Sequence, residues 1–115
     1  MNTMRQVNVI ALALTYSLAT TVKAQNLFVG NDGNGTIGEY GLNGSTVNAS
    51  LISELSYPEG IAFSGNDLFV ANIISGTVGE YTTSGATVNA SLISGLSSPF
   101  GLAISGNDLF VGDSG

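Results

Sequence analysis

The chain has no cysteine and no histidine, and its only two cations, Arg5 and Lys23, lie within the first 24 residues. The part that follows carries all eight acidic residues and no positively charged side chain, so no side-chain ion pair can form in it. Nucleic acid is excluded as a partner of this part, because neutralising phosphates requires Lys or Arg. Divalent cations stay compatible with it, because oxygen ligands are plentiful. Without disulfides, stability must come from packing and backbone pairing alone.

The first 24 residues have the features of an export signal. Arg5 provides a positive start, residues 9–22 are mostly apolar, and Val22-Lys23-Ala24 places small residues where a signal peptidase cuts. The apolar stretch is short and rich in hydroxyls for a membrane span, which needs about 20 apolar residues. An uncleaved anchor is the alternative. Cleavage after Ala24 leaves 115 − 24 = 91 residues without a predicted span, so we expect a secreted, periplasmic or cell-surface protein.

An internal repeat dominates the remaining sequence. Residues 26–66 and 67–107 align with a period of 41, and 26 of the 41 aligned positions are identical. A third copy begins at Asp108 and stops after eight residues. The predicted organisation is a signal peptide (1–24), a first, partial repeat (25–66), a second repeat (67–107) and the truncated start of a third (108–115).

Each repeat predicts four short strands and no helix, which makes the fold class all-β. From the end of the first copy through the second, the expected strands are 60–65, 67–72, 76–82 and 86–94, separated by Gly-Asn, Ser-Gly and Leu-Ser-Ser-Pro turns. Four antiparallel strands in 41 residues have the size of one β-propeller blade. A β-sandwich is the alternative, but it needs edge strands that differ from central ones. A β-solenoid fits the frequent hairpin turns less well.

The repeat resembles the YVTN-type and NHL-type propeller repeats of exported and surface-layer proteins, in the SMP-30/gluconolactonase-like group. The resemblance rests on Phe69-Val70-Ala71-Asn72, Gly76-Thr77-Val78 and Pro99-Phe100-Gly101-Leu102-Ala103, and on their counterparts 41 residues earlier. It implies a propeller fold and covers nearly all of residues 25–115. It says little about function, because such propellers have many activities.

The strands amount to three, four and two in successive units, or a little over two blades, whereas closed propellers need at least four. We therefore predict an amino-terminal fragment of a longer propeller. The alternative is a short chain that closes by self-association through its open blade faces.

Two catalytic motifs occur by coincidence. Residues 112–115 spell GDSG, the string around the nucleophile of trypsin-like proteases, but the chain has no histidine to act as the base. Residues 33–38 match G-x-G-x-x-G, but a strand and turn follow where a dinucleotide site needs a helix.

Glu59, Asn72 and Asp113 are the candidate metal ligands. Asn72 and Asp113 recur in the same slot at the end of the second strand of a blade, whereas Glu59 breaks the repeat, because Phe100 replaces it in the next unit. In propeller lactonases, which these units resemble, Glu, Asn and Asp hold a channel metal that activates water. A purely structural role at each strand end is the competing interpretation. Glu39 and Glu80 share another slot and suggest an acidic stripe for calcium or a solvated blade face.

The favoured function is a non-catalytic scaffold that binds an extracytoplasmic ligand or protein, without a cofactor. The rival is a lactonase or lyase-like enzyme that uses Ca²⁺ or another divalent cation.

Overall fold

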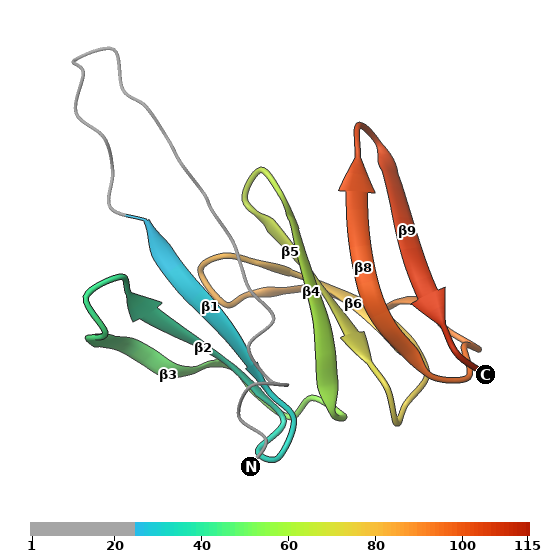
Figure 1. Cartoon of the computed structure of the whole chain (residues 1–115), viewed down its shortest axis with the longest axis horizontal. Coiled ribbons are helices and arrows are strands. Elements are labelled where there is room, and N and C mark those ends of the chain that lie inside the picture. The colour runs from blue at the N-terminus through green and yellow to red at the C-terminus, as the bar shows by residue number, and fades with distance from the viewer. Residues whose placement is uncertain (1–24) are drawn as a thin grey trace.

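The computed structural model describes residues 25–115; the predicted signal, residues 1–24, lies outside the described residues. Within the described part there are nine strands and no helix, so the predicted all-β class is confirmed. The strands form three antiparallel sheets of three, four and two strands, which lie side by side in chain order (Figure 1). No helix in this part is long and apolar enough to cross a membrane.

The three sheets repeat one strand order. Sheet 1 contains β1 (Asn26–Asn31), β2 (Thr36–Gly41) and β3 (Thr46–Ile52). Sheet 2 contains β4 (Pro58–Ser64), β5 (Asp67–Asn72), β6 (Thr77–Thr82) and β7 (Thr87–Ile93). Sheet 3 contains β8 (Pro99–Ser105) and β9 (Asp108–Asp113). The strands of sheet 2 agree with the predicted strands to within two residues at each end.

Glycines at defined positions make the turns that connect these strands. Gly65 and Gly106 each begin a two-residue turn with φ of 60° and 61°, the backbone that a type II′ hairpin requires at its first position. Gly76, with φ of 66°, closes the turn from β5 to β6, where its amide donates to the Asn72 carbonyl at 3.0 Å. The backbone thus confirms the hairpin turns that the Gly-Asn pairs predict.

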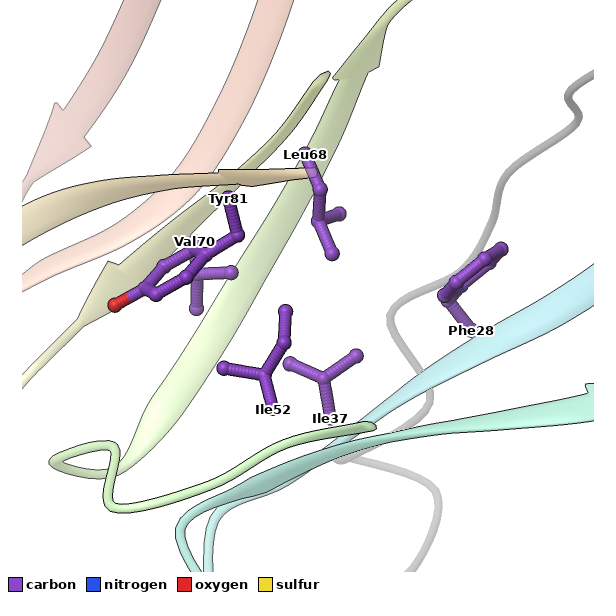
Figure 2. Packing of buried hydrophobic residues seen from close by; sticks show 6 residues of the cluster. All are labelled: Phe28, Ile37, Ile52, Leu68, Val70 and Tyr81. Atoms are coloured by element: carbon purple, nitrogen blue, oxygen red, sulfur yellow. The ribbon is translucent and has the colours of Figure 1, made fainter. Parts of the chain in front are cut away.

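The main hydrophobic core lies between sheets 1 and 2. Its buried members are Phe28, Ile37, Ile52, Leu68, Val70 and Tyr81 (Figure 2). Alternation along β5 sends Leu68 and Val70 to this core, and their cross-strand partners Phe63 and Ile61 pack against it. The rings of Phe28 and Phe63 lie 5.1 Å apart between centroids, which joins the two sheets.

Sheets 2 and 3 meet through their first strands, because β8 packs against β4 and β5. The contact is close: a Cβ built on Gly60 would lie 2.3 Å from the carbonyl oxygen of Phe100. Only a residue without a side chain allows the two backbones to approach in this way. Gly101, which occupies the same repeat slot on β8, has no heavy atom within 4 Å of such a Cβ.

Candidate functional site

The candidate ligand Asn72 is a buried residue at the end of β5, opposite Pro58 on β4. Its side chain is 3% exposed, and its Nδ2 donates to Thr77 Oγ1 at 3.4 Å across the turn. Its Oδ1 is buried and accepts no hydrogen bond from the described residues. The Nδ2 contact is the structural role expected of an amide that braces its own turn, and Oδ1 is the one atom left for another group.

Asp113 occupies the equivalent place at the end of β9, opposite Pro99, but is exposed. Its Oδ1 accepts from the Ser98 amide at 2.6 Å and from the Ser97 amide at 3.1 Å. These hydrogen bonds, that of Ser98 first, hold the pKa of the Asp113 carboxyl below its ordinary value. The carboxylate therefore already anchors the segment that leads into β8.

We expect the end of sheet 3 to loosen in acid. The native pKa of Asp113 lies below that of the unfolded chain, so its contribution to stability is complete above about pH 4 and disappears as the pH falls through the native pKa. NMR titration of the Ser97 and Ser98 amides should report a midpoint below that of a free aspartate. Asp113→Asn, which installs the residue of the Asn72 slot, should abolish this titration. A midpoint at the ordinary value would contradict the anchoring role.

Glu59 lies elsewhere, in the irregularity between Pro58 and Gly60 on β4. It is half-buried and lines a shallow hollow of about 230 Å³ between β4 and β8, together with Phe100 and Leu102. This is where the first strands of sheets 2 and 3 meet, and the propeller interpretation of the sequence predicts a channel ligand there.

The three candidate ligands are thus distributed over two sheets. Asn72 and Glu59 belong to sheet 2, where Asn72 pairs with Pro58 and Glu59 is the next residue along β4, and Asp113 belongs to sheet 3. Residues 25–115 contain no group of three or more His, Cys, Asp or Glu side chains that could hold a metal ion. The predicted ligand set includes an amide, Asn72, which is not one of these four residue types. The predicted metal site therefore stays a hypothesis.

A second hollow, of about 190 Å³, has Asn72 in its wall, together with Thr77 and Tyr81 of β6 and Glu54 from the loop between β3 and β4. Burial raises the pKa of Tyr81. Glu54 and Tyr57 in this loop have positive φ values of 62° and 58°, which non-glycine residues seldom adopt. The sequence analysis did not single out Glu54 or Tyr57. The signal that could have identified them is a break in the repeat, because the next unit has Gly95 and Ser98 at these positions.

Glu39 has a structural partner, since Asn26 Nδ2 donates to its Oε1 at 2.6 Å. In the second unit Asp67 replaces Asn26, so this contact cannot recur at Glu80. The two glutamates therefore have different neighbours despite their shared slot. The calcium stripe that their repetition suggested stays a prediction.

The outer strands β3 and β7 form the most repetitive surface. Both have the sequence TVNASLI, and the first five residues of each are exposed. A bulge interrupts each strand, and inside it the Asn48 and Asn89 side chains accept from the amides two residues ahead at 3.0 and 3.1 Å. These contacts use up part of the free backbone edge. What remains for a partner is a neutral surface of hydroxyl, amide and small apolar groups.

The observed class is an all-β protein of repeated antiparallel sheets stacked face to face. Known family models and curated proteins give no match to the chain. Among solved structures it is similar to the crystal structure of the computationally designed Ika4 protein, with a TM-score of 0.59 and 19% identity over 88% of this chain. At that identity the likeness concerns the fold alone. The chain spans 58% of the length of the designed protein.

Proposed function

We propose that this protein is an exported, non-catalytic scaffold of YVTN/NHL-like propeller blades that binds an extracytoplasmic ligand or protein. Sheets of one strand order, stacked through their first strands, support the blade architecture. The localisation rests on the predicted signal, and the scaffold role on the surface that the sheets present.

One observation carries the binding role: the strands β3 and β7 are identical in sequence although the first five residues of each are exposed. Residues 46–53 and 87–94 form the longest run of identity in the repeat. Most core slots are identical as well, such as Leu27 and Leu68, although the buried pair Ile37 and Val78 has changed. Packing constrains buried residues more than exposed ones, so it explains the identity of the core slots but not the identity of the exposed residues in β3 and β7. A function that uses the outer strands as a repeated contact surface explains that identity.

The rival, a metal-dependent lactonase or lyase-like enzyme, is favoured by Glu59. This residue breaks the repeat and faces the hollow between β4 and β8. A carboxylate is an oxygen donor of the kind that divalent cations bind. Asp113 argues against this enzyme, because its carboxylate already accepts hydrogen bonds from two backbone amides.

The surface can be tested by making both outer strands acidic. Val47 and Val88 are 54% and 53% exposed, so Val47→Glu with Val88→Glu should leave folding nearly unchanged. We expect the wild-type chain to co-sediment with the cell-envelope fraction of the producing organism and the double variant to lose at least about tenfold in affinity, which is a cost of about 1.4 kcal/mol.

Leu42→Glu is the matched control, because Leu42 is 68% exposed but lies outside these strands. Equal binding by the double variant and the wild type would contradict the proposed surface. The enzyme alternative is tested on the same preparation with an aldonic-acid lactone and millimolar CaCl₂. Lactone turnover, together with a rise in melting temperature in calcium, would overturn the scaffold in favour of the enzyme.

A further inference from the structure

We propose that two copies of this chain exchange strands: β8 of each copy pairs with the open edge of β1 in the other. Sheet 1 then becomes four-stranded, like sheet 2. This assembly goes beyond the proposed function, since it concerns how the sheets are completed rather than what their outer strands bind.

The repeat defines what fits the open edge of β1. Strands β1, β5 and β9 occupy one slot, and their inner residues Leu-Phe-Val are the same in all three. At this edge β5 pairs with β4, and β9 pairs with β8. The register is the same in both pairs: Ile61 lies opposite Val70, and Leu102 lies opposite Val111. Among the described residues β1 has no strand at that edge, because it ends the order of its sheet. The matching register places Leu102 of one copy opposite Val29 of the other.

Strand β8 is the one that can exchange its sheet partner, β9, for β1 of the other copy. It belongs to a two-stranded sheet, an arrangement that is marginal by itself in water. Strand β4, with the same pattern, is held in a four-stranded sheet. Pairing with β1 gives β8 a sheet of three strands in place of a single partner.

The side chains that meet β8 would hardly change in the exchange. The β1 sequence NLFVGN differs from the β9 sequence DLFVGD only at its two ends, where neutral Asn26 and Asn31 replace Asp108 and Asp113. The apolar face that β8 needs is therefore already present on β1. The β8–β9 ladder and the hydrogen bonds of Asp113 to the segment before β8 are lost, and β9 is displaced, which is a cost that the new β8–β1 ladder and the larger sheet have to offset.

The stacking of sheets 2 and 3 makes the exchange geometrically consistent. Strand β8 stays packed on β4 through the close approach of Gly60 to Phe100, so it brings sheet 1 of the other copy to the face of sheet 2. Residues 25–115 of two copies then contribute four four-stranded sheets, the smallest number that closes a propeller, and β9 of each copy lies outside them. In that ring Gly101 lies against residue 59 of the other copy, as Gly60 lies against Phe100.

The exposed edges of the molecule differ in a way that favours this partner. The outer strands β3 and β7 are bulged, which discourages further pairing. Strand β1 pairs with β2 over six consecutive residues without any irregularity. Its open edge is therefore the flat one, and flat edges accept an added strand most readily.

Native mass spectrometry of the full chain is expected to show two copies. Gly101→Ala is the sharp variant: within one copy the added Cβ meets nothing within 4 Å, whereas in the ring it would meet the backbone of the other copy. We expect at least a tenfold weaker dimer with unchanged secondary structure by circular dichroism. A single-chain mass for the wild type, or a dimer that Gly101→Ala leaves intact, would overturn the proposal.

Engineered cysteines test the register, because the chain has none of its own. Val29→Cys with Leu102→Cys should give covalent dimers after oxidation with diamide, because paired strands bring Cα atoms within disulfide range. Leu102→Cys with Val111→Cys is the matched control, since it locks β8 onto β9 within one copy and should give monomers. Covalent dimers from Val29→Cys alone at the same yield would show chance collision and refute the register.

Discussion

Gly76→Ala is expected to lower the free energy of unfolding by about 2–4 kcal/mol, through backbone strain and steric overlap together. Gly76 has φ of 66°, and a Cβ there would lie 2.2 Å from the carbonyl oxygen of Leu96. The Gly76 carbonyl also accepts the Leu96 amide at 3.0 Å, which ties the β5–β6 turn to the segment entering β8. The substitution should break this tie, because neither backbone can move without disturbing its strand.

Gly65→Ala separates the two causes. Gly65 has nearly the same φ, 60°, but a Cβ there meets nothing within 4 Å, so only the strain of about 1–2 kcal/mol remains. Urea unfolding of both variants at one protein concentration gives the comparison. Equal losses would mean that the contact with Leu96 contributes nothing. Gly35 has the same geometry against Leu55 in the first unit, so Gly35→Ala should reproduce the larger loss.

Leu68→Ala is expected to cost about 2–5 kcal/mol, because it opens a cavity in the core between sheets 1 and 2. Leu68 is fully buried and belongs to the same cluster as Ile37 and Val70. For a domain of about 90 residues such a loss is a large fraction of the total stability. Sheets 1 and 2 share this cluster, so they should unfold together and earlier than in the wild type.

Leu109→Ala is the control for this substitution, because Leu109 holds the same slot on β9 and is only half-buried. The loss of unfolding free energy in Leu109→Ala should be smaller than in Leu68→Ala by at least about 1 kcal/mol, because folding removes less apolar surface from water at Leu109. Thermal unfolding followed by circular dichroism reports both, and complete loss of the transition in Leu68→Ala alone would agree with the prediction. Similar losses at the two positions would mean that sheet 3 is as well packed as the core.

Sequence and structure agree on the strands because their signals are local. A short apolar run between turn residues, as in β5, needs no distant partner to be recognised. Turns such as Gly65-Asn66 are equally local, since the required φ selects glycine. Counting these local signals along the chain also predicted the three, four and two strands of the successive sheets. Whether the sheets belong to a closed propeller is part of the proposal.

The candidate site was less predictable because its roles depend on distant atoms. The sequence groups Asn72 with Asp113 by their slot, but Asn72 contacts Thr77 whereas Asp113 binds the amides of Ser97 and Ser98. The positive φ of Glu54 and Tyr57 had no local signal other than a break in the repeat. The close approach of Gly60 to Phe100 required knowledge of which sheets stack.

The sequence by itself determined the strands, the turns, the lack of ion pairs beyond residue 24 and the equivalence of the repeats. Only the tertiary structure decided what each equivalent residue experiences. Phe28 is 3% exposed and Phe110 is 57% exposed, although both occupy the same slot of the same motif. Phe28 faces the sheet that follows it, whereas no described sheet follows Phe110. Burial depends on the neighbouring sheet, and a repeated sequence does not specify its neighbours.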